Sequence, residues 1–247
     1  IKNFGPLLGD FNLNEVLNIK EIDFTNKVNP VYKAINLVNK NELMREKSTI
    51  GFVGAPWTLL VYILNKQSPK LNLKDNFFED EFIINKILFI LEKFLKIHVK
   101  NQILNGAEII QIFDSWAGLL DQKYLHNYIY EPTLRLVEYI KTLNIPTICF
   151  PRGIKDYQNY CEIVKPDAVC IDYEVDPIEI SKKIKIPVQG GMDPKILLSD
   201  KDNLKKHAKK YLDIFKDHPY IFNLGHGVLP ETNPNMMDYL VKTVKDY

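Results

Sequence analysis

The sequence predicts an α/β fold built around a parallel sheet. Short, continuous apolar runs alternate with amphipathic, helix-like segments from residue 49 to the C-terminus. The runs lack the apolar–polar alternation of a half-exposed strand, so they are typical of strands covered on both faces. A strict alternation of such strands with helices indicates parallel pairing.

The first 143 residues contain the longer elements. A helix-like stretch at 29–44 precedes the first strand at 49–54, and Gly106 is placed to end a long amphipathic helix over 79–106. Glycine just beyond the last turn is a common way for a helix to end. A strand at 108–113 and a helix at 122–143 follow. Because proline disrupts a helix interior, Pro132 marks an interruption or a second helix start.

From residue 146 onward, short strands and helices repeat. Strands are expected at 146–150, 168–172, 187–190 and 220–224, and helices at 156–164, 177–184, 203–216 and 233–246. No linker divides the chain, and the Asn/Lys-rich segment 65–76 is expected to be an exposed loop. Counted together, the pattern gives six β/α units. They could form an open doubly wound sheet, or the last six units of a (β/α)8 TIM barrel occupying residues 1–247 as one domain.

Composition excludes several functional classes. The net charge of +1 gives no reason to expect a nucleic-acid partner. Three cysteines without a Cys-x-x-Cys pair favour a reducing compartment, and no long apolar stretch predicts a membrane span. A cytoplasmic location is the default expectation. Because the chain begins at Ile1, an upstream segment is also expected, and a plastid address stays open.

Polar, aromatic and glycine residues gather just after the strands, where parallel α/β folds bind ligands. Each also has a plain structural interpretation. Trp57 is expected to pack, Tyr62 to lie on the first turn of a helix, and Asp193 to cap a helix that begins at Pro194. Four further residues are candidates for ligand binding: Asp114, Ser115, Arg152 and Asp172. The structural alternative is a helix cap for Asp114, Ser115 and Asp172, and a surface ion pair for Arg152.

His226 stands out because it lies between two glycines in the stretch Y-I-F-N-L-G-H-G-V-L-P-E-T, residues 220–232. Imidazole titrates near neutral pH. Glycines remove side chains where a ligand could approach the backbone closely. The stretch therefore predicts a functional histidine after the last strand.

Four motifs, in order and with matching spacing, resemble the uroporphyrinogen decarboxylase family. They are G-F-V-G-A-P-W-T-L-L-V-Y (51–62), Q-I-F-D-S-W-A-G (111–118), Q-G-G-M-D-P (189–194) and F-N-L-G-H-G-V-L-P-E-T (222–232). F-G-P-L-L-G-D near the start and F-P-R-G (150–153) fit as well. The resemblance implies a TIM barrel that acts as a homodimer in haem and porphyrin biosynthesis. It would remove four acetate carboxyl groups from uroporphyrinogen III to give coproporphyrinogen III, without a metal or organic cofactor.

The resemblance also implies roles for residues that match the family's motifs. Tyr62 and His226 would be the catalytic polar groups, and both would contact substrate together with Ser115. The cavity wall would include Phe52, Gly54 and Ala55. On this interpretation, the glycines beside His226 let a flat tetrapyrrole lie against the backbone.

Two family features are absent from this sequence. Neither the arginine-rich opening motif nor the S-D-I segment with its essential aspartate is found. The chain contains only three arginines, Arg45, Arg135 and Arg152, which is few for a substrate with eight carboxylates. The chain is therefore expected to be the last six units of the barrel, with the first two units upstream.

Two other functions stay open. A zinc-dependent corrinoid:thiol methyltransferase of the same fold would need a His-x-Cys pair where this chain has Thr147–Ile148–Cys149, and a later cysteine that is absent after Cys170. A non-catalytic barrel that binds porphyrins is the second alternative. It would be favoured if the chain naturally began at Ile1.

Overall fold

The computed structural model describes residues 12–65, 73, 78 and 80–247. Six strands form one sheet in the order β1-β2-β3-β4-β5-β6, and every neighbouring pair is parallel. The strands are β1 (Ile50–Gly54), β2 (Ile109–Asp114), β3 (Thr147–Pro151), β4 (Ala168–Ile171), β5 (Val188–Gly190) and β6 (Tyr220–Ile221). Sequential order with parallel pairing confirms the predicted α/β class.

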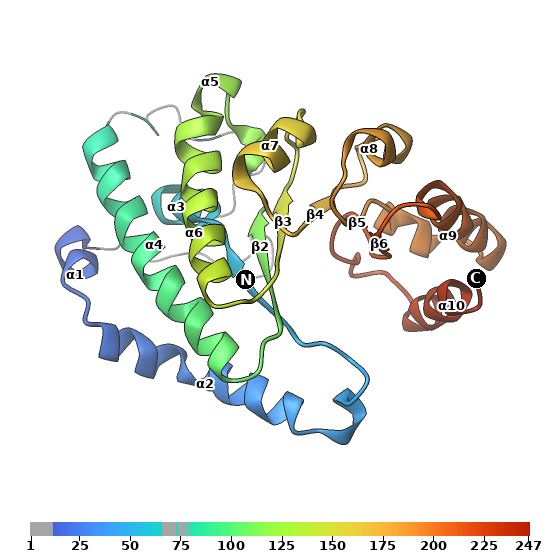
Figure 1. Cartoon of the computed structure of the whole chain (residues 1–247), viewed down its shortest axis with the longest axis horizontal. Helices are drawn as coiled ribbons and strands as arrows, with labels where there is room; N and C mark the ends of the chain where they lie inside the picture. The colour runs from blue at the N-terminus through green and yellow to red at the C-terminus, as the bar shows by residue number, and fades with distance from the viewer. Residues whose placement is uncertain (1–11, 66–72, 74–77, 79) are drawn as a thin grey trace.

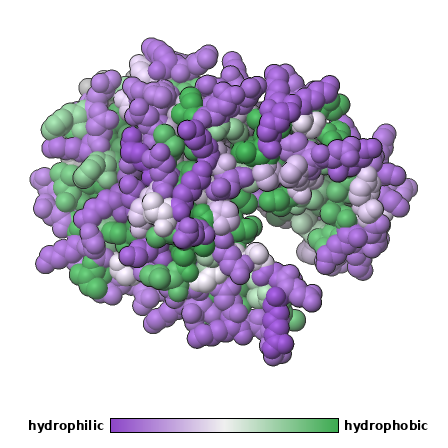
Figure 2. All heavy atoms as spheres, in the orientation of Figure 1, coloured by the Kyte–Doolittle hydropathy of each residue, from purple (hydrophilic) through white to green (hydrophobic). Residues whose placement is uncertain are grey.

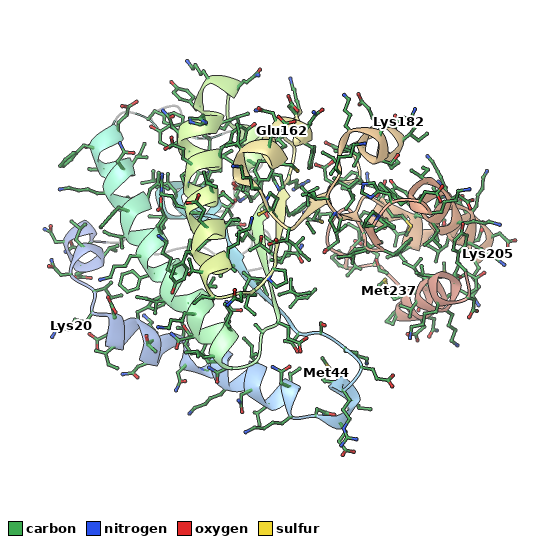
Figure 3. All side chains as sticks on the ribbon, in the orientation of Figure 1. Lys20, Met44, Glu162, Lys182, Lys205 and Met237 are labelled. Carbon is green, nitrogen blue, oxygen red and sulfur yellow. The ribbon has the colours of Figure 1, made fainter. Side chains whose placement is uncertain are left out.

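Helices follow the strands and cover the outer side of the sheet (Figure 1). The α-helices are α1 (Leu13–Leu17), α2 (Glu21–Asn39), α3 (Pro56–Asn65), α4 (Glu81–Leu104), α5 (Gln122–Leu125), α6 (Glu131–Thr142), α7 (Tyr157–Val164), α8 (Pro177–Lys183), α9 (Lys201–Phe215) and α10 (Pro234–Lys245). Shorter turns are η1 (Glu42–Met44), η2 (Ala117–Leu119), η3 (His126–Tyr130) and η4 (Pro194–Leu198). Figure 3 shows Lys182 on α8 and Lys205 on α9 pointing away from the sheet, as expected for solvent-facing positions.

Most predicted elements are confirmed, and the clearest difference is the start of α2. Helix α4 ends at Leu104, and Gly106 follows its cap with φ +109°, as predicted. The helix expected at 122–143 is interrupted by the π-helical turn η3, and Pro132 begins the second piece, α6. Helix α2 begins at Glu21, eight residues before the predicted start, and contains Pro30. The predicted loop 65–76 and the motif F-G-P-L-L-G-D fall mainly outside the described residues.

The two faces of the sheet carry different cores. The outer face packs against the helices in one large apolar cluster that includes Val53, Ile110, Ile112, Cys149 and Val169. The inner face holds a smaller cluster of Ile148, Phe150, Ala168 and Cys170, with Ile109 and Phe113 packed against it. Successive side chains of a strand point to opposite faces, which accounts for this division.

The sheet curves toward its inner face. Nε2 of Gln189 on β5 lies 3.4 Å from Oε1 of Gln111 on β2, although two strands separate β2 from β5 in the sheet. The outermost strands leave inner-face residues exposed, with Phe52 of β1 64% exposed and Ile221 of β6 42% exposed. Figure 2 shows the surface hollowed on this side, with hydrophobic atoms at the edge of the hollow. The inner face is therefore an open, largely apolar concavity.

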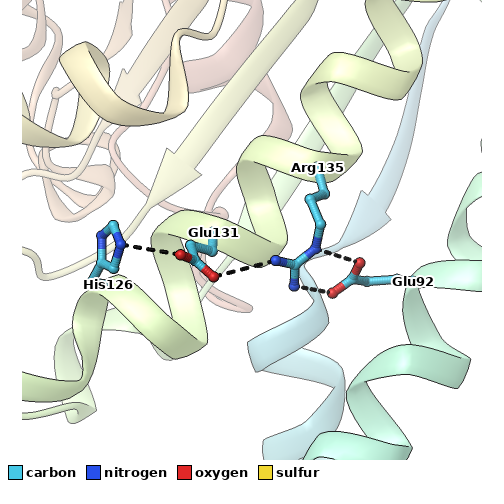
Figure 4. Close-up of polar contacts among 4 residues, drawn as sticks. All are labelled: Glu92, His126, Glu131 and Arg135. Atoms are coloured by element: carbon cyan, nitrogen blue, oxygen red, sulfur yellow. Dashed lines mark hydrogen bonds and ion pairs between the residues drawn. The ribbon is translucent and has the colours of Figure 1, made fainter.

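A charged network joins the outer helices. Arg135 of α6 donates two hydrogen bonds to Glu92 of α4, from Nε at 2.9 Å and from an Nη atom at 2.6 Å, and also contacts Glu131 at 3.4 Å (Figure 4). Glu131 lies 3.2 Å from Nε2 of His126. Glu92 is almost buried, so the paired guanidinium is required to compensate its charge. The network therefore fixes α6 against α4 behind the sheet.

Candidate active site

The carboxyl ends of the six strands meet along one edge, and the predicted site residues follow those ends. Tyr62 lies on α3 after β1, Ser115 follows β2, and His226 follows β6. Between them come Arg152 directly after β3 and Asp172 directly after β4. The structure gathers these residues into two groups, one at β1 and β2 and the other at β3, β4 and β6.

Tyr62 belongs to the first group, but not where the sequence placed it. Helix α3 begins at Pro56, directly after the strand, so Tyr62 lies in the second turn rather than the first. Proline is favoured at the first helical position, and this explains the early start. The half-buried Tyr62 ring meets the Trp116 ring edge-on, with centroids 6.2 Å apart at 75°.

Three hydrogen bonds hold the loop after β2 against α3. The Thr58 hydroxyl donates to Oδ1 of Asp114 at 2.7 Å and accepts from the Trp116 backbone N–H at 3.3 Å. The indole N–H of Trp57 donates to the Trp116 carbonyl at 2.9 Å. Half-buried Ser115 is fixed between these anchored neighbours. We call Thr58, Tyr62, Asp114 and Trp116 the Trp116 cluster.

Asp114 does not cap a helix, which was the alternative that its sequence context allowed. Its carboxyl group is buried, with one oxygen bonded to Thr58 and Oδ2 without a partner among the described residues. Burial raises the pKa of Asp114 to about 7, and the hydrogen bonds from Thr58 offset only part of that rise. Sequence reasoning missed Thr58, because nothing in the local pattern links a helical threonine to an aspartate 56 residues later.

Aromatic rings from neighbouring strands line the inner face below this edge. Phe52 meets Phe113 edge-on with centroids 6.0 Å apart, and Phe113 meets Phe150 in the same way at 6.1 Å. Gly54 is partly exposed at the end of β1. Ala55 is fully buried, and its backbone N–H donates to the Phe113 carbonyl at 2.8 Å. Phe52 is thus the most accessible of the predicted wall residues.

The second group consists of Arg152, Asp172 and His226, which we call the Arg152 cluster. Asp172 is buried and accepts hydrogen bonds from the Gly153 N–H at 2.9 Å, the Tyr157 hydroxyl at 3.2 Å and the Glu174 N–H at 2.9 Å. It therefore ties the loops after β3 and β4 together. Asp172 does not cap the next helix, because Asp176 caps α8; within the chain, Asp172 acts as a loop anchor.

His226 is exposed overall, but its imidazole is partly shielded. Partial burial and the positive charge of Arg152 lower the pKa of His226, while a hydrogen bond with the Gly227 backbone and the charge of Asp172 act in the opposite direction. The charges of Arg152 and Asp172 thus act on His226 across the curved edge of the sheet. The imidazole is consequently biased toward its neutral form, which can accept a proton at neutral pH.

The two glycines beside His226 have different structural reasons. A Cβ on Gly225 would lie 2.5 Å from the Tyr173 backbone nitrogen and 2.8 Å from the Asp172 carbonyl carbon. Gly225 therefore allows two loops to pack backbone to backbone. A Cβ on Gly227 would meet nothing within 4 Å. Only Gly227 leaves the open space that the ligand interpretation requires.

Other strand-end motifs have structural roles. Asp193 accepts a hydrogen bond from the Lys195 N–H at 2.8 Å and caps η4, as predicted. Gly190 and Gly191 have φ values of +87° and +98°, in the region that glycine adopts readily. Trp57 is fully buried and stacks on Phe78 with centroids 6.2 Å apart, consistent with a packing role.

A cavity of about 440 Å³ lies beside the same edge, between η2, η3 and the loop that leads into α7. Its lining includes Gly118, His126, Tyr130, Gly153 and Asn159. None of Tyr62, Ser115 and His226 lines it. This cavity is therefore separate from these three predicted site residues.

The described residues contain no group of three or more His, Cys, Asp or Glu side chains arranged to hold a metal ion. Cys149 lies in the outer cluster between sheet and helices, fully buried, and burial raises the pKa of its thiol to about 12. A thiol of this kind is a poor source of thiolate for metal ligation.

None of the described helices has both the length and the apolar character required to cross a bilayer.

Comparison with known proteins gives consistent results. The family model described as "Uroporphyrinogen decarboxylase (URO-D)" matches residues 4–247. A protein named uroporphyrinogen decarboxylase from Rickettsia bellii is 39% identical over all of this chain and 74% of its own length. One of the same name from Wolbachia pipientis wMel is also 39% identical, over all of this chain and 73% of its own length.

Solved structures support the fold. A methyltransferase from Methanosarcina mazei superposes with a TM-score of 0.72 at 15% identity, over 89% of this chain. The match spans 64% of the methyltransferase, slightly under two-thirds of its length. At this identity the likeness concerns the fold alone. The matching family model and full-chain relatives, together with the parallel sheet and its strand-end motifs, show that this chain belongs to the uroporphyrinogen decarboxylase family.

Proposed function

We propose that the protein is a decarboxylase of porphyrin biosynthesis, acting on uroporphyrinogen III as a single barrel-type domain. It would remove the four acetate carboxyl groups and release coproporphyrinogen III. Family membership carries this proposal. The strand-end motifs support it, because they bring polar groups to the rim of an open apolar concavity that could accept a large, flat ligand.

The chemistry requires a temporary acceptor for the electron pair that is left when CO₂ departs. Protonation of a pyrrole ring carbon makes an iminium-like cation, and the electrons of the breaking carbon–carbon bond flow into it. The side-chain carbon is then protonated to a methyl group, and the ring carbon returns its proton. Each cycle consumes one proton and releases one CO₂, so a polar site that relays protons is sufficient. No metal or organic cofactor is part of the proposal.

Tyr62 and His226 are the proposed catalytic residues. With its pKa lowered by partial burial and by Arg152, the His226 imidazole can accept and pass on a proton near a substrate carboxylate. The Tyr62 hydroxyl, on a ring held against Trp116, would act as a polar partner at the opposite end of the sheet. Ser115 would hold a substrate side chain through its hydroxyl.

The remaining proposed contacts form the wall of the site. Phe52 offers an exposed ring for stacking against a pyrrole, and Gly54 and Ala55 keep the end of β1 free of bulk. A homodimer and a cytoplasmic location are proposed on family grounds. The relatives described above are bacterial and lend no support to a plastid location.

Turnover of uroporphyrinogen III tests the proposal. The protein is incubated anaerobically with this substrate and without added metal, and the products are separated by their number of carboxylates. The expected result is a ladder from eight to four carboxylates that is lost on heat denaturation. Retention of all eight by folded protein would overturn the decarboxylase proposal and leave binding alone to be tested.

A further inference from the structure

Arg152 differs from the two other arginines of the chain. Arg45 pairs with Glu42 at 3.0 Å, and Arg135 pairs with Glu92 at 2.6 Å. Within the described part of the chain, the Arg152 guanidinium has neither an ion pair nor a side-chain hydrogen bond. Arg152 is half-buried as a residue, and its guanidinium carries five N–H donors. Arg152 is thus a cation without a side-chain partner among the described residues, at the edge where the site residues gather.

The nearby carboxylate does not fill this need. Asp172 follows the neighbouring strand, yet Oδ2 accepts from the Gly153 N–H and the Tyr157 hydroxyl, and Oδ1 accepts from the Glu174 N–H. These three hydrogen bonds direct the carboxylate toward the loops. Meanwhile Arg152 lies close enough to His226 to disfavour its protonated form. The Arg152 guanidinium therefore has no carboxylate partner among the described residues, and this leaves a place for an external anion.

The backbone of Arg152 is held on both sides. Its N–H lies 3.1 Å from the Asp114 carbonyl, and its carbonyl accepts from the Gly118 N–H at 2.9 Å. A Cβ on Gly118 would approach the Gly153 backbone to 2.8 Å, so the two loops are in direct backbone contact. The base of the side chain is therefore fixed before any ligand arrives, which reduces the entropic cost of binding.

We propose that Arg152 is a substrate-binding residue whose guanidinium holds one carboxylate side chain of the tetrapyrrole beside His226. The assignment rests on the proposed function for its substrate class. Guanidinium presents a planar pair of donors that matches both oxygens of a carboxylate, and lysine cannot reproduce this geometry. Arg152 would thereby supply one of the carboxylate clamps that an eight-carboxylate substrate requires.

A consequence for His226 follows. A carboxylate bound to Arg152 offsets the positive charge that now helps to lower the His226 pKa. The pKa of His226 should therefore rise when substrate binds, and the imidazole should take up a proton from solvent. Substrate binding would load a proton at the place where decarboxylation consumes one. The charges acting on the imidazole are those of Arg152 after β3 and Asp172 after β4.

Kinetics and a histidine titration test the proposal together. Turnover of uroporphyrinogen III is compared for the wild type, Arg152→Gln, Arg152→Lys and the control Lys155→Gln, which removes an exposed cation from the same loop. We expect Arg152→Gln to raise KM about ten- to a hundredfold with kcat little changed, as for loss of a charge-assisted hydrogen bond. Arg152→Lys should recover part of the loss, and Lys155→Gln should match the wild type.

The second readout is the His226 imidazole, followed by NMR against pH with and without uroporphyrin, an unreactive eight-carboxylate tetrapyrrole. In the free protein, Arg152→Gln should raise the His226 pKa, and added uroporphyrin should shift it less than in the wild type. An unchanged KM with an unchanged His226 titration would overturn the proposal, as would an equal KM increase in Lys155→Gln. Absence of wild-type turnover would count against the decarboxylase instead, while the titration still tests Arg152.

Discussion

The Trp116 cluster and the Arg152 cluster occupy the same edge of the sheet but are built differently. In the Trp116 cluster, direct hydrogen bonds join buried or half-buried groups, and Asp114 is enclosed. In the Arg152 cluster, buried Asp172 ties the loops, while the Arg152 guanidinium and the exposed His226 interact through charge. The difference indicates that the first group fixes the shape of the edge, whereas the second leaves charged groups available to a ligand.

The largest expected effect is a loss of activity when His226 of the Arg152 cluster is replaced. His226→Asn should lower kcat about a hundredfold or more, as for loss of a general acid–base group, while the free energy of unfolding stays close to that of the wild type because residue 226 is exposed. Product ladders and urea denaturation measure the two quantities. His207→Asn on α9 is the matched control and should retain wild-type turnover. An unchanged rate and product profile in His226→Asn would remove its catalytic role.

The sequence predicted the strands closely because each is a short apolar run bounded by glycine, proline or charged residues. Strand β6 is the exception, since only Tyr220 and Ile221 join the ladder before the chain departs, and Leu224 returns to it in a single bridge with Met192. Helix α2 was predicted too short because its first turns carry few apolar residues to establish a helical period.

The sequence predicted where the candidate residues lie relative to the strands, but not which of them interact. Parallel strands place their carboxyl ends on one edge, so the approximate positions of Ser115 and His226 followed from the pattern. Which of these residues interact depends on the curvature of the sheet and on loop paths. The influence of Arg152 on His226, three strands away in sheet order, could not be derived from local spacing. The same is true of the bond from Thr58 to Asp114.

The second prediction tests the structural character of the Trp116 cluster through pH. The folded-state pKa of Asp114, about 7, exceeds the ordinary value of 3.8. Between these values the unfolded chain has lost a proton that the folded protein still holds, so stability should fall as pH rises from about 4 to about 7. Asp114→Asn keeps an acceptor for Thr58 and cannot ionise. The free energy of unfolding of Asp114→Asn should therefore not fall over this pH range. Above pH 7 the variant should be more stable than the wild type, by at most about 4 kcal/mol.

Urea denaturation at pH 4.5, 6 and 8 measures this effect for both proteins. Thr58→Val serves as the companion variant, since it removes the only side-chain donor to Asp114 among the described residues and leaves the carboxyl group able to titrate. It should keep the wild-type direction of the slope. If Asp114→Asn and the wild type lose stability in parallel, Asp114 is not the group that titrates, and the enclosed character of this cluster would be wrong.

The smallest effect concerns the two glycines on either side of His226. It separates loop packing from substrate approach at the backbone next to the Arg152 cluster. Gly225→Ala places a methyl group against the backbone of Asp172 and Tyr173, whereas Gly227→Ala places the same group in open space. Overpacking against backbone costs about 1–3 kcal/mol, so Gly225→Ala should lower the free energy of unfolding by roughly that amount. Gly227→Ala should leave folding unchanged.

If tetrapyrrole lies against this backbone, Gly227→Ala should nevertheless raise KM, because its methyl group occupies space that the free protein leaves empty. Equal destabilisation by the two substitutions would show that both glycines serve loop packing, and the approach of substrate would have to be sought on the Phe52 side of the concavity.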